Sequence, residues 1–324
     1  MTRTRRYLHH RPSAGIAILV LITLLSGRNV IGQEESTTLE QFQREIVMRL
    51  TGGADILPGI RLSNRTSPEA RALVRAFMVT TLDSLGLDPQ RQSYRENGEN
   101  VYALLPATTQ SDEYIVLGAH FDSARRSPGA NDDATGCAAV LGVASYLVSL
   151  PERSKNIFFV LFDEEERGLV GSRAFAEMLQ EKELAVVAVH TIDQMGWDAD
   201  GDRAIELELP YDGAVELYRE AATASDYSAE LHITEEPGSD HTAFRRLGMP
   251  AVGLTEEYRN RDTTPHIHRQ GDTWDTVDFV YLAIVTRLIQ SAMAILTRPG
   301  HHQGVISELT DPPVSEEAVI RICA

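Results

Sequence analysis

The sequence predicts a single-domain α/β protein, a three-layer sandwich in which helices flank a mixed, mostly parallel central sheet. Three observations support this fold class. Short apolar runs alternate along the chain with longer segments whose apolar residues recur at helical spacing. Two of the short runs, residues 114–119 and 156–162, are almost continuously apolar, which is typical of strands covered by helices on both faces. The chain has 324 residues, enough for one large domain with a sizeable core.

The expected elements follow one another without an internal repeat or a low-complexity linker over residues 39–297. Ser67 and Pro68 open one of the helices as its cap and first-turn proline. Strands are expected at 101–106, 114–119, 156–162, 185–192, 204–209 and 251–255. Helices are expected at 39–51, 67–86, 134–150, 168–179, 213–224, 240–247 and 277–296.

The two ends of the chain differ from this central part. Four arginines lie among the first 11 residues, and an apolar run at 14–25 follows. That run is shorter than the ~20 residues of a membrane-spanning helix. Together with the small residues before Gln33, it has the layout of a secretory signal peptide. We therefore expect a signal peptide at 1–32, a folded domain at 33–298, a polar tail at 299–324, and a secreted or periplasmic protein. An uncleaved membrane anchor is the alternative; after cleavage no stable membrane insertion is expected.

The charge balance limits the classes of partner. The net charge is −17. Loss of residues 1–32 removes five arginines and no acid, so the mature chain carries −22, from 25 basic and 47 acidic residues. Such a chain repels phosphate backbones, which argues against a nucleic-acid partner. The two cysteines, Cys137 and Cys323, form no CxxC pair and predict no disulfide.

Candidate ligands follow the predicted strands. The strand at 114–119 leads into His120 and Asp122, which strand alternation places on the same side. An imidazole that binds a metal usually has a carboxylate or carbonyl on its other nitrogen. Asp132 and Asp133 stand in a glycine-containing turn just before the next helix. Each signal alone also fits a hydrogen-bonded strand end or acids that complement a helix dipole.

The later strand ends add more acids. Four consecutive acids, residues 163–166, follow the apolar strand at 156–162, and Asp193 follows the strand at 185–192. Acids beside a buried strand are costly unless a positive charge compensates them, and a metal is one such charge. His266 and His268 stand in the loop before the last long helix. Histidines and carboxylates gathered at one sheet edge form a mixed N/O set suited to zinc, or less well to cobalt or manganese.

Six segments resemble the secreted co-catalytic zinc aminopeptidase family, whose zinc exopeptidase fold also occurs in glutamate carboxypeptidase, glutaminyl cyclase and the transferrin receptor ectodomain. The segments occur in the family's order and cover roughly residues 95–297. They are GAHFDS (118–123), PGANDDATG (128–136), FDEEERGLVGS (162–172), IDQMG (192–196), SDHTAFRRLGMPAV (239–252) and IHRQGDT (267–273). The combination of the first three is highly specific.

The resemblance implies an exported metallopeptidase that binds two Zn²⁺ per chain and removes residues from peptides with a free N-terminus. Asp132 would bridge the metals. His120 and Asp193 would complete one site, and Glu166 and His268 the other. The implied catalytic residues are Glu165, as the general base for a metal-bridging water, and Asp122, which would orient His120. The resemblance also implies that the peptide bond between Asp132 and Asp133 is cis, and it favours His268 over His266 as the last ligand, because His268 stands four residues before Asp272.

Departures from the family pattern leave other activities open. Glu164 stands where the family usually has a small residue, and Arg269-Gln270 replace a more usual Thr-Pro. Both changes concern the shape and charge of the pocket, so the preferred substrate residue is not predicted. Glutaminyl-peptide cyclotransferase is the alternative enzyme on the same fold, and a non-catalytic binding ectodomain is a further one. Residues proposed to reach the site are Arg125, Arg126, Tyr258, Arg259 and Arg269.

Overall fold

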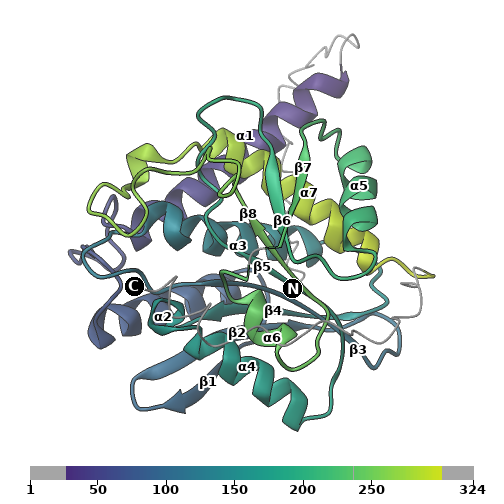
Figure 1. Ribbon diagram of the computed structural model, residues 1–324, viewed down its shortest axis with the longest axis horizontal. Coiled ribbons are helices and arrows are strands. Elements are labelled where there is room, and N and C mark those ends of the chain that lie inside the picture. The colour runs from purple at the N-terminus through teal and green to yellow at the C-terminus, as the bar shows by residue number, and fades with distance from the viewer. Residues whose placement is uncertain (1–26, 236, 301–324) are drawn as a thin grey trace, which may run out of the picture.

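The computed structural model describes residues 27–235 and 237–300, which form an eight-stranded sheet in the order β1-β2-β4-β3-β5-β8-β6-β7 (Figure 1). β4, β3, β5 and β8 run parallel to one another, and so do β6 and β7. The β1–β2, β2–β4 and β6–β8 pairs are antiparallel. The expected mixed, mostly parallel sheet is confirmed. The strands are β1 (Pro89–Arg95), β2 (Gly98–Leu105), β3 (Glu113–His120), β4 (Asn156–Phe162), β5 (Ala185–Ile192), β6 (Ile205–Glu208), β7 (Leu231–Thr234) and β8 (Ala251–Thr255).

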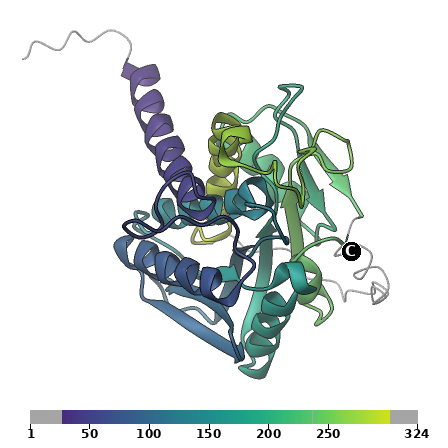
Figure 2. The same cartoon turned by 90° about the vertical axis from the view of Figure 1, so that its left-hand side faces the viewer.

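Helices cover both faces of the sheet, which confirms the three layers. One face packs against α1 (Gly27–Leu50), α2 (Pro68–Ser84), α3 (Thr135–Leu147), α5 (Ala214–Ala224) and α7 (Phe279–Leu296). The other packs against α4 (Val170–Glu181) and α6 (His241–Arg245). The first turns of α1, purple in Figure 2, extend away from this body. Residues 1–26 of the expected signal peptide and residues 301–324 of the expected tail lie outside the described residues. Helix α1 runs across residue 32, the expected end of the signal peptide.

The side chains of strand β4 pack into two hydrophobic cores, one on each face of the sheet. Every residue of β4 is buried. Phe159 and Leu161 pack with the larger helical layer, whereas Phe158 and Phe162 pack with α4 and α6. A strand that alternates between two covered faces needs apolar residues at every position, which explains its unbroken apolar run. On the adjacent strand, Gly118 leaves room for the ring of Phe162, whose Cε2 lies 2.4 Å from where a Cβ would be.

The two edge strands differ from expectation. Strands β1 and β7 were not predicted, because β1 (PQRQSYR) is polar and β7 (LHIT) has only four residues. A serine at the start of a helix commonly caps it, but Ser239 does not cap α6. Its hydroxyl has no hydrogen-bond partner, and only its backbone carbonyl accepts from Thr242 N–H. Helix α7 is long and apolar enough to cross a membrane, but 67% of its 18-residue window is buried inside the protein, as in a core helix.

Candidate metal centre

The candidate site lies where three neighbouring strands end. β4, β3 and β5 are adjacent and parallel, so their carboxyl ends meet at one edge of the sheet. His120 is the last residue of β3, and Asp193 directly follows β5. After β4, Glu165 and Glu166 lie in η2 (Glu165–Arg167), a single turn of 3-10 helix. The sheet topology therefore gathers side chains that are far apart in the sequence.

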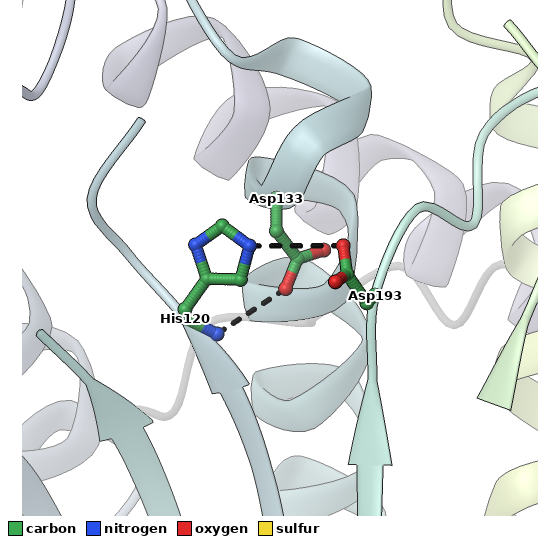
Figure 3. Close-up of side chains that lie close together, drawn as sticks. All are labelled: His120, Asp133 and Asp193. Atoms are coloured by element: carbon green, nitrogen blue, oxygen red, sulfur yellow. Dashed lines mark hydrogen bonds and ion pairs between the residues drawn. The ribbon is translucent and has the colours of Figure 1, made fainter. Parts of the chain in front are cut away.

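The first group surrounds the imidazole of His120, whose side chain is only 1% exposed. Its Nε2 lies 3.2 Å from Oδ1 of Asp132 and 3.6 Å from Oδ1 of Asp193. Asp132 comes from η1 (Ala130–Ala134), the turn that leads into α3. Figure 3 shows the carboxylate of Asp193 facing the ring from the end of the neighbouring strand. One nitrogen thus faces two carboxylate oxygens.

The second group uses the other oxygen of Asp132. His268 Nε2 lies 3.1 Å from Oδ2 of Asp132 and 3.3 Å from Oε2 of Glu166. The side chain of His268 is 41% exposed, so this group faces the solvent. The two oxygens of Asp132 therefore face two different histidines, and this carboxylate lies between the groups.

Both groups have the chemistry of metal ligands. Ligand atoms of Asp132, Glu166 and His268 lie within 4.8 Å of one another. His120 Nε2, Asp193 Oδ1 and Glu166 Oε1 are buried without a hydrogen-bond partner. Burial, with the charge of Asp132 nearby, raises the pKa of Glu166 to about 8. Unpaired imidazole nitrogens among buried carboxylates fit a divalent cation such as zinc.

Two further carboxylates touch this cluster. Asp122 Oδ1 lies 3.5 Å from His120 Nδ1, the nitrogen that points away from Asp132. The same oxygen accepts a hydrogen bond from the backbone N–H of Glu165 at 3.0 Å. Glu165 Oε2 lies 3.9 Å from His120 Nε2, beside the ligand atoms. Burial raises the pKa of Glu165 well above its usual range. Asp122 thus contacts both a candidate ligand and a candidate base.

The model of peptidase family M28 matches residues 100–293, which include this entire cluster. The chain belongs to peptidase family M28. It is 28% identical over 193 residues to aminopeptidase YwaD of Bacillus subtilis (strain 168); the match covers 58% of this chain and 42% of that protein. The chain therefore spans less than half the length of this relative.

Solved structures share the fold. The zinc aminopeptidase BSAP from Bacillus subtilis has a TM-score of 0.72 at 15% identity, covering 82% of this chain and 97% of that one. Glutaminyl cyclase from Porphyromonas gingivalis has a TM-score of 0.63 at 20% identity, covering 78% and 97%. The M28 chain therefore has a fold found in both enzyme types.

Asp133 is a near neighbour with a different role. Its carboxylate also lies within ligand distance of His120 and Asp193. However, it accepts a hydrogen bond from the backbone N–H of His120 at 3.2 Å (Figure 3). It also accepts from the backbone N–H groups of Gly136 at 2.8 Å and Gln194 at 3.3 Å. Because these amides occupy its oxygens, Asp132 is the better candidate for the shared ligand. The peptide bond between Asp132 and Asp133 is cis, in agreement with the resemblance.

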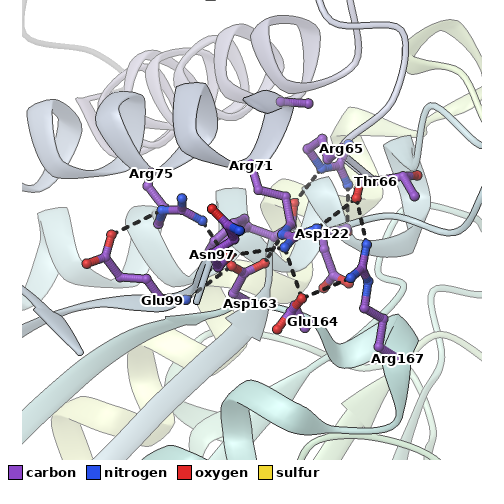
Figure 4. A network of polar contacts seen from close by, with 12 residues as sticks. Arg65, Thr66, Arg71, Arg75, Asn97, Glu99, Asp122, Asp163, Glu164 and Arg167 are labelled. Atoms are coloured by element: carbon purple, nitrogen blue, oxygen red, sulfur yellow. Dashed lines mark hydrogen bonds and ion pairs between the residues drawn. The ribbon is translucent and has the colours of Figure 1, made fainter. Parts of the chain in front are cut away.

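The four acids after β4 divide into two pairs. We expected a metal to compensate the charges of all four acids. Arginines compensate the first two, Asp163 and Glu164, so only Glu165 and Glu166 are candidates for compensation by a metal. Arg71 Nε lies 2.7 Å from Asp163 Oδ1, and its Nη2 lies 2.9 Å from Glu164 Oε1 (Figure 4). Further arginines pair with the first two acids: Arg75 with Asp163, and Arg95 and Arg167 with Glu164. These ion pairs fix the turn that presents Glu165 and Glu166.

Two buried carboxylates that were not singled out hold the loops of the M28 site. Asp272 accepts hydrogen bonds from the backbone N–H groups of Asn131 at 2.7 Å and Asp132 at 3.2 Å. Glu256 accepts from the side-chain amide of Asn131 and from the backbone of Thr264. Both fix the turn of Asp132 against the loop that carries His268. Glu256 directly follows strand β8, just as Asp193 directly follows strand β5. A search for acids at the ends of the predicted strands would therefore also have identified Glu256.

A cavity of about 370 Å³ opens beside the cluster. Asp132, Glu165, Glu166, Asp193 and His268 form one part of its wall. The other lining residues are Gln194, Glu208, Gly238, Ser239, Thr255, Tyr258, Arg259 and Ile267. Of the five residues proposed to reach the site, Tyr258 and Arg259 line this cavity, while Arg125, Arg126 and Arg269 are not part of its wall. His266 packs edge-on against Trp197 instead of joining the cluster.

Proposed function

We propose that this M28 chain is a metallo-aminopeptidase that binds two zinc ions and removes the N-terminal residue from peptides. One observation carries the proposal: the two oxygens of Asp132 face two separate ligand groups. A shared carboxylate between two N/O groups is what a pair of metals a few ångströms apart requires. The family match and the aminopeptidase relative support the reaction class.

The proposed ligands follow from this arrangement. His120 and Asp193 would hold one ion, Glu166 and His268 the other, and Asp132 both. When bound, the two ions would lower the pKa of a water molecule between them and polarise the scissile carbonyl. Three buried atoms of the two groups, His120 Nε2, Asp193 Oδ1 and Glu166 Oε1, have no hydrogen-bond partner. This supports the ligand set, because a bound metal would give each of them a partner.

Glu165 is the proposed general base. Its carboxylate borders the cavity and lies beside His120 but belongs to neither three-residue ligand group. It would take a proton from the attacking water and deliver it to the leaving amine. Asp122 is the proposed positioning residue, because it contacts His120 Nδ1 and holds the backbone of Glu165. A carboxylate on the second imidazole nitrogen fixes the tautomer that binds metal.

A hydrolysis panel tests the reaction class. Purified enzyme is stripped with a chelator, reloaded with zinc, and offered aminoacyl amides, the same amides with blocked amines, and an N-terminal glutamine peptide. Zinc-dependent release from the free-amine substrates alone is the expected result. Cyclisation of the glutamine peptide without hydrolysis of the others would assign the chain to the cyclase class. Release of the residue at the carboxyl end of the glutamine peptide would indicate a carboxypeptidase. Bound zinc with no turnover of any substrate would favour a binding domain.

We also propose that residues 1–32 direct export and are removed, leaving the folded unit at 33–298 and the tail at 299–324. The basic start and short apolar run support this proposal. N-terminal sequencing of protein recovered from the medium or periplasm should begin at Gln33. Protein that keeps its first residues in the membrane fraction would indicate an anchor instead.

A further inference from the structure

The wall of the cavity away from the metal cluster carries several polar side chains. It contains Gln194, Glu208, Ser239, Thr255 and Arg259 as polar side chains, with Ile267 as its one aliphatic side chain. If the chain is an aminopeptidase, as proposed above, the side chain of the substrate's first residue must lie beside the metal centre. The chemistry of this wall therefore decides which first residue fits.

Among the residues that the structure describes, Glu208 is the acidic one in this part of the wall. It ends strand β6, and its side chain is only 7% exposed. Its partner position on β8 is Gly253, and a Cβ there would lie 2.6 Å from Glu208 Oε2. The glycine thus lets the carboxylate lie across β8 beside the cavity. Each of the other four carboxylates in the wall belongs to the metal cluster or is the proposed base.

The surroundings of Glu208 leave its charge poorly compensated. The nearest imidazole nitrogen, His241 Nδ1, is 3.8 Å away, and burial lowers the pKa of His241 to about 3, so this ring is neutral. Burial and the charge of Asp193 raise the pKa of Glu208 to about 8, and the charge of Arg259 offsets only part of this rise. Arg259 also lines the cavity, and its side chain is exposed. A buried carboxylate gains most from a cationic ligand.

Two further acceptors point to the same kind of ligand. Gln194 Oε1 and Ser239 Oγ are buried without a hydrogen-bond partner, and both residues line the cavity. A leucine side chain would leave these atoms and Glu208 unpaired, which is costly for buried polar groups. A lysine ammonium carries three donors and an arginine guanidinium five, and neither carries an acceptor. The methylene groups of a lysine or arginine side chain can pack against Tyr258 and Ile267.

We propose that this part of the cavity binds the side chain of the substrate's N-terminal residue and that Glu208 selects lysine or arginine there. The inference rests on the proposed aminopeptidase function. It assigns to Glu208 a specificity-determining contact rather than a role in the bond-breaking step.

The test compares kcat/KM of the zinc-loaded enzyme for lysyl, arginyl, leucyl and glutamyl amides. We expect the wild type to prefer the two basic substrates, and Glu208→Gln to lower the lysyl-to-leucyl ratio by roughly tenfold to a hundredfold, the range for loss of a charge-assisted contact. Glu257→Gln is the matched control, because Glu257 is a nearby buried acid outside the cavity wall. It should leave the ratio unchanged.

A binding measurement separates this inference from the proposed function. Titration calorimetry with free arginine and free leucine requires no turnover. Tighter binding of arginine, lost in Glu208→Gln, would support the pocket even if every amide stayed intact, an outcome that would overturn the proposed hydrolysis alone. A wild-type preference for leucyl or glutamyl substrates, or a ratio that Glu208→Gln does not move, would overturn the role of Glu208.

Discussion

The carboxylate of Asp122 accepts a hydrogen bond from the backbone N–H of Glu165 at 3.0 Å. The same Oδ1 lies 3.5 Å from Nδ1 of His120. A single oxygen therefore links the candidate base to a candidate ligand. The position of one cannot change without affecting the other.

Replacing Asp122 should impair catalysis while the metal cluster remains. Asp122→Asn keeps the size but presents an amide to His120, which favours the wrong tautomer. We expect activity or zinc affinity to fall roughly tenfold to a hundredfold, as for other carboxylates behind metal-binding imidazoles. Steady-state kinetics with a zinc titration measures both. Wild-type kinetics and affinity in Asp122→Asn would remove the positioning role.

Replacing the proposed base should separate metal binding from turnover. In Glu165→Gln, zinc content should stay near the wild-type value, because Glu165 is outside both ligand groups. Turnover should fall by about 10²–10⁴-fold, the range for loss of a general base. Metal analysis and single-turnover kinetics on the same preparation check this. Full activity in the variant would refute the assignment.

Loss of Asp132 should affect both ions. Since its oxygens face His120 and His268 separately, Asp132→Ala should bind less than one zinc per chain under conditions where the wild type binds two. His268→Ala should still bind one. Zinc per chain after dialysis, measured by atomic emission, distinguishes them. If Asp133→Ala rather than Asp132→Ala abolished binding, the shared ligand would be Asp133.

Breaking the arginine network should destabilise the fold. Arg71 is buried and pairs with Asp163 and Glu164. Arg71→Met removes the cation but leaves the two buried acids, and we expect a loss of about 3–5 kcal/mol in unfolding free energy. Urea unfolding measures it. The control is Arg219→Ala, which removes an exposed pair and should cost less than about 1 kcal/mol.

The buried His190 should make stability depend on pH. Burial lowers its pKa to about 3, and both ring nitrogens contact tyrosine hydroxyls at 3.0 Å. The unfolded chain binds a proton near pH 6.5 and the native chain does not, so stability is lost as the pH falls through this range. The contribution is about 1.4 kcal/mol per pH unit. Relative to the wild type, His190→Gln should lose this slope between pH 6 and 4 in urea titrations; an unchanged slope would mean that the native ring titrates normally.

The sequence predicts this fold well because its central strands are buried on both faces and carry unbroken apolar runs, as β4 does. The edge strand β1 is polar and contacts solvent, so its pairing with β2 leaves little trace in the residues themselves. All five predicted ligands and both predicted catalytic residues meet at one sheet edge, because each follows a strand end or lies in a matched motif.

The sequence predicts which residues follow a strand better than it predicts where their side chains point. Asp163 and Glu165 stand two residues apart, yet one faces arginines and the other faces the cluster. The turn at Glu164, where φ is 64°, separates them. The arginines come from helix α2, about ninety residues earlier, and no local pattern shows this contact. Such long-range pairs depend on the packing of whole elements.

The two histidines of the cluster differ greatly in their contact with water: His120 is 1% exposed and His268 is 41% exposed. In the proposed enzyme the ion held by His268 would therefore exchange with solvent more readily than the ion held by His120. A dilute chelator would remove the outer ion first, and the supply of metal would act on activity mainly through the exposed position.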